Sequence, residues 1–217
     1  MEFLSYMSKY VVLDLEMCNV SKQARQGAFK SGKELIQIGA VELDENYNIT
    51  RSFQSFVKPE FGALDPFIEN LTGIKPENLE NAPSTDRALR EFYEWLDDSS
   101  TLVTWSDCDV IQIDDELYYK EIDIPGLYDY IDEYVDCQYL FGEMFHVSKQ
   151  YNLKDALTIA NVEYDLNLHN ALVDAMNTAL LFSKLQTEDR ATFSPYFMTQ
   201  EEASMYIFNS FSRRCLV

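Results

Sequence analysis

Five short stretches of the chain have the character of β-strands, and the clearest are a branched aliphatic run at 10–17 and an alternation of apolar and polar residues at 34–43. Turn residues separate the first three stretches, which predicts an antiparallel meander. Each of the last two precedes a region with helical spacing. The expected strands are 10–17, 34–43, 49–58, 101–105 and 134–138.

Apolar residues at intervals of three and four, together with capping residues, predict helices between and after these strands. Ser84 is a good N-cap, and Gly73 has the position of a residue just past a helix end. The expected helices are 66–71, 84–97, one following 106–109 and ending near 120, 138–149, 153–160 and 168–185. No linker divides them, so we expect one α/β domain over residues 1–186, with a helical extension, 187–217, packed on it.

Two carboxylates interrupt the first predicted strand where apolar side chains would be expected. Asp14 and Glu16 are two residues apart, so they point to the same face of the strand. Two like charges in an apolar setting repel each other and lose hydration unless a cation lies between them. Carboxylate oxygens suit magnesium and manganese, which favours a divalent-metal site. A solvated edge strand with both acids in water is the alternative.

A third carboxylate, Asp174, lies in the predicted helix 168–185, which is apolar on nearly all sides and should be buried. A buried carboxylate requires a partner or a metal. His169 precedes Asp174 by five residues, and five residues turn a helix by about 500°. The two side chains therefore do not share a face of one regular helix, and we expect His169 at or before its first turn.

Composition limits the classes of function. The net charge of −20 argues against a general, salt-driven grip on long duplex nucleic acid. No apolar run approaches the roughly 20 residues of a membrane helix, and the first residues do not fit a secretory signal. The four cysteines show neither a CxxC pair nor zinc-ligand spacing. Disulfides are therefore not expected, and we expect a cytoplasmic location.

Charge is unevenly distributed along the chain. Residues 18–33 contain four cations and no acid, and they form either a solvated loop or a flap that contacts phosphates. Residues 114–136 contain nine acids and a single lysine, and we expect them to form a solvated face.

The order of the candidate residues resembles the DEDDh branch of the DnaQ-like 3′–5′ exonucleases. The matching motifs are D-x-E at Asp14-Leu15-Glu16, an acid after an aromatic residue at Trp105 to Asp109, and H-x(4)-D at His169 to Asp174. Framework segments 36–41, 71–74, 135–138 and 153–157 agree as well, and the resemblance covers roughly residues 8–186. Asp107 is a second candidate for the middle motif. We choose Asp109 because the family has its acid four residues after the tryptophan.

The resemblance implies a ribonuclease-H-like fold, a central mixed five-stranded sheet with three antiparallel and two parallel strands, flanked by helices. It implies a metal-dependent 3′–5′ exonuclease that hydrolyses short single-stranded RNA or DNA to nucleoside 5′-monophosphates. Two divalent cations, Mg²⁺ or Mn²⁺, would lie about 4 Å apart. Their implied ligands are Asp14, Glu16, Asp109 and Asp174. His169 would be the general base, because imidazole exchanges protons near neutral pH.

The resemblance also implies contacts with the terminal nucleotide. The implied substrate-binding residues are Met17, Leu71, Thr72 and Trp105. Met17 stands where many members of the family have threonine, a departure that bears on base or sugar preference.

Two other functions are compatible with the sequence. One is a catalytically silent module that binds nucleic acid or protein. The other is a proofreading exonuclease that acts with a polymerase. A protein partner or a homo-oligomer is compatible with each of them.

Overall fold

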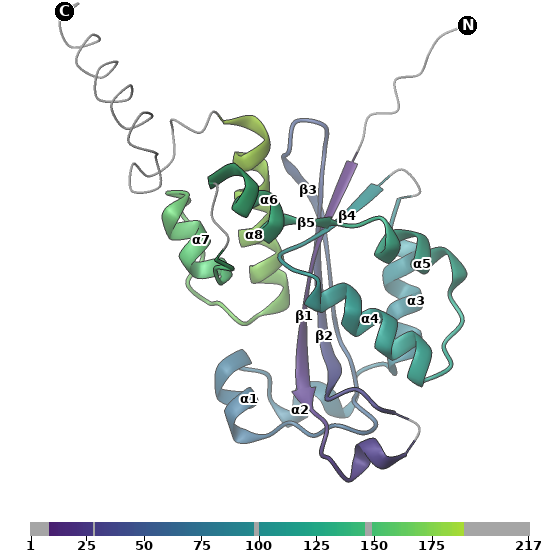
Figure 1. Cartoon of the computed structure of the whole chain (residues 1–217). Coiled ribbons are helices and arrows are strands. Elements are labelled where there is room, and N and C mark those ends of the chain that lie inside the picture. The colour runs from purple at the N-terminus through teal and green to yellow at the C-terminus, as the bar shows by residue number, and fades with distance from the viewer. Residues whose placement is uncertain (1–8, 28, 98–99, 146–148, 189–217) are drawn as a thin grey trace, which may run out of the picture.

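The computed structural model describes all residues except 1–8, 28, 98–99, 146–148 and 189–217 (Figure 1). Nearly all of the expected C-terminal extension, 187–217, lies outside the described residues, so this boundary stays a prediction. In the described part of the chain, no helix is both long enough and apolar enough to cross a membrane.

Five strands form one mixed sheet in the order β3-β2-β1-β4-β5. β2 runs antiparallel to both β1 and β3, whereas β4 runs parallel to β1 and β5 parallel to β4. This confirms the predicted mixture of three antiparallel and two parallel strands. The strands are β1 (Lys9–Asn19), β2 (Lys33–Leu43), β3 (Ile49–Phe56), β4 (Ser100–Thr104) and β5 (Val135–Asp136).

Helices cover both faces of the sheet (Figure 1). α3 (Thr85–Trp95), α4 (Cys108–Tyr119) and α5 (Pro125–Asp132) lie on one face. The other face carries α6 (Cys137–Phe145), α7 (Leu153–Ile159) and α8 (Ala171–Thr187). Near the C-terminal end of β1 lie α1 (Pro66–Thr72) and α2 (Pro76–Glu80), together with the short 3-10 helix η1 (Ala24–Gln26).

Successive side chains of β1 point to opposite faces of the sheet, and this determines which helices each side chain contacts. Leu13 and Leu15 belong to the core that α3, α4 and α5 cover, whereas Val12 belongs to the core around α6 and α8. Side chains two apart share a face, so Asp14 and Glu16 follow Val12 toward α8. The apolar pattern of β1 thus determines which helix meets its two carboxylates.

Two short helices, α2 and α5, were not predicted from the sequence. Each begins with a proline at its first position, a residue that suits a helix start because its missing N–H has no intrahelical partner there. In α5, Leu127 and Ile131 are four residues apart and buried. The prediction of a solvated face over 114–136 was therefore wrong at these positions, because acidic residues flank a buried apolar pair.

Glu116 is a second correction to that prediction, because it lies fully buried in an ion cluster. Lys120 Nζ lies 2.7 Å from Glu34 Oε1 and 2.8 Å from Glu116 Oε2, and both carboxylates are inaccessible to solvent. The Glu34 carboxylate also accepts hydrogen bonds from the backbone N–H groups of residues 60–62. This cluster ties α4, the start of β2 and the segment before α1 together.

Gly39 allows α8 to approach the sheet. It pairs with Asp14 across β1 and β2. A Cβ atom at this position would overlap with the carbonyl carbon of Ala171 and the nitrogen of Leu172 in the first turn of α8. Only a residue without a side chain permits this approach, which brings the first turns of α8 next to Asp14.

We predict that Gly39→Ala displaces the start of α8 and destabilises the protein. Overpacking of a close contact typically costs about 1–3 kcal/mol, which corresponds to a fall in Tm of roughly 2–12 °C for a chain of this size. Thermal unfolding followed by circular dichroism measures this change. Gly27→Ala is the matched control, since its Cβ would lie at an ordinary 3.5 Å from the Ala24 oxygen. Equal melting temperatures for both variants would contradict the close approach.

Candidate active site

Asp109 extends the hydrogen bonding of β1 beyond the end of β4. The pairing of β1 with β4 ends at Leu13 and Thr104, which leaves the Leu15 N–H beyond the end of the neighbouring strand. Asp109 Oδ1 accepts a hydrogen bond from this N–H at 3.2 Å. Asp109 is buried in the first turn of α4, whereas Asp107 is exposed just before that helix. The geometry therefore favours Asp109 over Asp107 as the member of the carboxylate group.

Asp174 is held by the backbone that precedes α8. His169 adopts a left-handed conformation with φ of 67°, and its N–H donates to Asp174 Oδ2 at 2.8 Å. Asn170 then caps the helix by accepting a hydrogen bond from the Val173 N–H. The predicted helix 168–185 therefore begins later, at Ala171. His169 precedes the first turn, as the five-residue spacing predicted.

Gln37 fixes the start of α8 on the sheet. Its side-chain oxygen accepts a hydrogen bond from the Ala171 N–H at 3.1 Å, and both residues are fully buried. Gln37 and Gly39 position α8, a role that the sequence did not assign to them, although both lie in framework segment 36–41. The available signal was the polar Gln37 between Ile36 and Ile38, because a buried amide requires partners.

The side chains of three elements converge on one site. Glu16, His169 and Asp174 each offer one ligand atom, and these atoms lie within 4.8 Å of one another. The charges of Asp109, Asp174 and Glu16 all act on Asp14, so the four predicted carboxylates form one electrostatic group. The structure thus brings together the five predicted catalytic and metal-binding residues.

All four carboxyl groups have raised pKa values. Burial is the main cause of each shift, and repulsion from neighbouring carboxylates adds to it at three of them. The pKa of Glu16 rises to about 8 and that of Asp109 to about 7, while the pKa of Asp14 rises well above its usual range. The pKa of Asp174 is raised as well, although the His169 N–H opposes this shift. Protons or cations must balance this group of charges.

The site has the chemistry of a hard-metal centre. Asp174 Oδ1 is buried, and no hydrogen-bond partner for it exists among the described residues. The four carboxylates of the site supply the oxygen ligands that Mg²⁺ and Mn²⁺ prefer. The donor set therefore fits divalent cations.

The four predicted substrate-binding residues differ in accessibility. Met17 is half-buried beside a β-bulge that follows Glu16, and Leu71 is 37% exposed on α1. The Thr72 hydroxyl donates to the Ile68 carbonyl within its own helix. Trp105 is 8% exposed and packs edge-on against Phe141 in the core. Met17 and Leu71 are therefore the more accessible members of this set.

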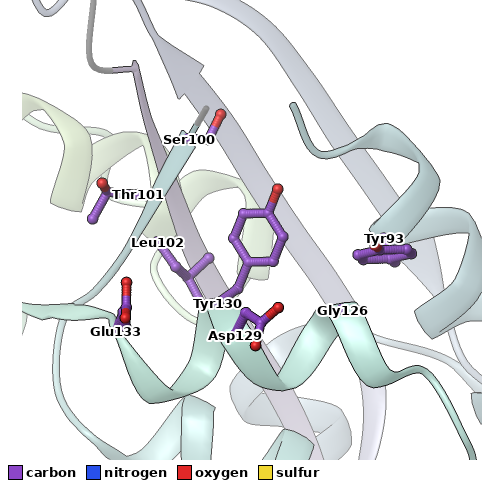
Figure 2. Close-up of a pocket in the computed structure, with 8 residues that line it drawn as sticks. All are labelled: Tyr93, Ser100, Thr101, Leu102, Gly126, Asp129, Tyr130 and Glu133. Carbon is purple, nitrogen blue, oxygen red and sulfur yellow. The ribbon is translucent and has the colours of Figure 1, made fainter. Parts of the chain in front are cut away.

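A separate pocket lies at the opposite end of β4 (Figure 2). Its lining includes Ser100, Thr101 and Leu102 at the start of that strand, and Tyr93 and Tyr130 from α3 and α5. The four carboxylates of the candidate active site, Asp109 among them, lie beyond the other end of β4. This pocket is therefore not part of the candidate active site.

Comparison with solved structures gives the fold. The nuclease domain of 3′hExo, a DEDDh family member bound to rAMP, superposes with a TM-score of 0.69 at 21% identity, covering 84% of this chain and 94% of that one. Pop2p of S. pombe, in its Mg²⁺- and Mn²⁺-bound form, gives a TM-score of 0.62 at 20% identity, covering 82% and 83% of the two chains. These similarities confirm the ribonuclease-H-like exonuclease fold.

Comparison of sequences gives the family. An ERI1 exoribonuclease 2 of Danio rerio is 30% identical over an alignment of 182 positions, which covers 73% of this chain and 32% of that protein. The chain thus spans less than a third of that relative. The DNA polymerase III subunit epsilon of Buchnera aphidicola is 28% identical over 211 residues, covering 94% of this chain and 77% of the other. The family model RNase_T, described as exonuclease, matches residues 11–182. The chain therefore belongs to the RNase_T exonuclease family.

Proposed function

We propose that the protein is a metal-dependent 3′–5′ exonuclease that removes nucleoside 5′-monophosphates from short single strands of RNA or DNA. The observation that carries the proposal is the convergence of four carboxylates with His169 in a member of the exonuclease family. The rAMP bound to 3′hExo supports a nucleoside monophosphate as the product.

Two divalent cations, Mg²⁺ or Mn²⁺, are part of the proposal. Their ligands would be Asp14, Glu16, Asp109 and Asp174. When bound there, such ions orient the scissile phosphate, stabilise charge on the leaving oxygen and favour deprotonation of the attacking water. Pop2p, with its bound Mg²⁺ and Mn²⁺, supports the choice of metals.

His169 is the proposed general base. Its side chain is exposed, and it precedes α8, so the imidazole can reach a water at the carboxylates and exchange protons with solvent. It accepts the proton of the attacking water as the new P–O bond forms and the P–O3′ bond breaks. The backbone N–H of the same residue keeps Asp174 in place.

The terminal nucleotide would lie between the carboxylates and α1. Asn19 follows Glu16 by three residues, and its side chain donates to Asp65, which caps α1. This connection places α1, with its exposed Phe67 and Leu71, beside the C-terminal end of β1. Apolar side chains at that position suit stacking against a base.

A proofreading exonuclease that acts with a polymerase is the second candidate. The similarity to a DNA polymerase III subunit epsilon over 94% of this chain favours it. Such an enzyme would prefer a mismatched 3′ end of DNA, and a polymerase would deliver its substrate.

A cytoplasmic location also belongs to the proposal, supported by the free thiols of Cys18, Cys108 and Cys137.

The first prediction tests the activity itself. With Mg²⁺ or Mn²⁺, the protein should shorten 5′-labelled decamers of RNA or DNA in single-nucleotide steps from the 3′ end. EDTA or Asp14→Asn should abolish the ladder on a denaturing gel, because both remove a necessary part of the metal site. Including single-stranded, duplex and mismatched substrates separates the two candidates. A folded wild-type protein that shortens no substrate would leave only the binding-module alternative.

The second prediction concerns the general base. His169→Asn retains a residue type that tolerates a left-handed backbone, so the hydrogen bond to Asp174 should persist. Loss of general-base catalysis should lower kcat by about 10²–10⁴-fold with little change in KM or Tm. Steady-state hydrolysis and thermal unfolding measure these quantities. A kcat within tenfold of the wild type would remove His169 from this role.

The third prediction follows from the raised carboxyl pKa values. Near neutral pH the folded protein retains protons on Glu16 and Asp109 that the unfolded chain has already released. The resulting stability is fully present below the ordinary carboxyl pKa and is lost progressively as the pH rises to the folded-state pKa, which is about 7 for Asp109 and about 8 for Glu16. In EDTA, Tm should therefore fall between pH 5.5 and 8.5, and the increase in Tm caused by Mg²⁺ should grow over the same range.

Two variants control this measurement. Asp14→Asn should weaken both trends, since it removes one charge from the group. Asp114→Asn should leave them unchanged, because Asp114 is exposed on α4. A Mg²⁺ effect on Tm that is independent of pH in the wild type would contradict the assignment of metal binding to these carboxyl groups.

A further inference from the structure

A loop rich in cations follows the last residue of β1. We define the basic loop as residues 20–27 and 29–32 together with Lys33, the first residue of β2. It contains Lys22, Arg25, Lys30 and Lys33 and no acidic residue. These are four of the 17 basic residues in a chain of net charge −20. The three lysines are exposed, and Arg25 is half-buried.

The cations of the basic loop form no ion pair with the part of the chain that the structure describes. The basic side chains that do form ion pairs lie elsewhere, at Lys9, Arg51, Lys75, Arg87, Arg90, Lys120 and Lys184. In addition, Arg25 Nε is buried without a hydrogen-bond partner in the described part of the chain. Lys30 Nζ donates a hydrogen bond to the Gln26 carbonyl, and the charge of Lys33 acts on Asp65. The loop therefore presents positive charge that no ion pair with a described residue neutralises.

Packing holds the basic loop in a defined position. The Val20 N–H donates to the Gly32 carbonyl at 3.0 Å and closes the loop. Phe29 is fully buried and stacks on Phe61 with ring centroids 5.0 Å apart. Lys120 Nζ, the centre of the buried ion cluster, lies 5.4 Å from the centre of the Phe29 ring. A cationic surface anchored in this way is ordered before a ligand arrives, so a ligand does not have to order it.

The basic loop lies within a few nucleotides of the carboxylates. Three residues of extended strand, about 10 Å, separate Glu16 from Asn19 at the end of β1. Figure 1 shows the purple loop directly beyond that end. The loop is therefore too far from Glu16 to contact the scissile phosphate, but near enough to meet the next few phosphates of the same strand.

We propose that the basic loop binds the phosphates of nucleotides on the 5′ side of the scissile bond. Single-strand binding surfaces combine backbone-tracking cations with nearby aromatic side chains, here Phe61, which is 38% exposed and stacks on Phe29 of the loop. The consequence is a length requirement, in which oligonucleotides several residues long are bound more tightly than dinucleotides. This inference rests on the proposed function and deepens it.

The test compares two variants that change the net charge equally. The first combines Lys22→Gln, Lys30→Gln and Lys33→Gln in the basic loop. The control combines Arg87→Gln and Arg90→Gln on α3 with Lys154→Gln on α7, all of them exposed and none in the loop. For each protein, kcat/KM is measured on a single-stranded decamer and on a dinucleotide. Decamer binding is measured by fluorescence anisotropy at several salt concentrations, with Ca²⁺ in place of Mg²⁺.

On the decamer, the loop variant should lose at least about tenfold in kcat/KM and at least about tenfold in affinity. The slope of log K for decamer binding against log salt concentration should become shallower by about 0.7 for each lost phosphate contact. The kcat/KM of the loop variant on the dinucleotide should stay within about twofold of the wild type, and the control should match the wild type throughout. If the loop variant binds the decamer as tightly as the wild type does, or loses the same factor in kcat/KM on the decamer and on the dinucleotide, the inference is overturned. Hydrolysis by the wild-type protein in the same experiment would still uphold the proposed function. Loop-dependent decamer binding without any wild-type hydrolysis would overturn the proposed function, and with it the position of the loop relative to a scissile bond, and would leave the loop as a binding surface for single strands.

Discussion

Repulsion among buried carboxyl groups is the constraint on which the rest of the structure depends. Burial raises the pKa values of all four acids at the site, and neighbouring carboxylates raise those of Asp14, Glu16 and Asp109 further, so gathering them costs free energy that the fold must offset. Backbone hydrogen bonds hold two of them in place, from the Leu15 N–H to Asp109 and from the His169 N–H to Asp174. The acids are thus positioned by the sheet and by the start of α8, so a cation or substrate does not have to order them.

Local pattern was sufficient to predict part of this arrangement. Asp14 stood out on an apolar strand and Asp174 on an apolar helix, because an ionisable group is conspicuous where burial is expected. The contact between Gln37 and Ala171 joins residues 134 positions apart, and neither residue has a local feature that identifies the other. Helix α5 was not predicted for a different reason. Acidic residues surround its two buried residues, Leu127 and Ile131, in the sequence, so the segment has the composition of a solvated surface.

The distribution of charge explains how so acidic a protein could act on a polyanion. Most of its surface would repel nucleic acid, so affinity must come from a few positions. The carboxylates with their cations would hold the scissile end, and the basic loop would hold the strand that leads to it. The buried cluster around Lys120 connects these two regions, because it contacts Phe29 in the loop and Glu116 in α4, the helix that carries Asp109. Repulsion elsewhere would favour strand ends over continuous duplexes.

The two edges of the sheet have a consequence for self-association. Strand β5 contains only two residues, and four of the first five residues of β3, including Arg51, are exposed and mostly polar. Short and polar edges are poor templates for the addition of a strand from another molecule. Contacts between copies of this chain, or with a partner, would therefore use helices or loops rather than extend the sheet. The same property protects a protein with such apolar central strands from aggregation through its backbone.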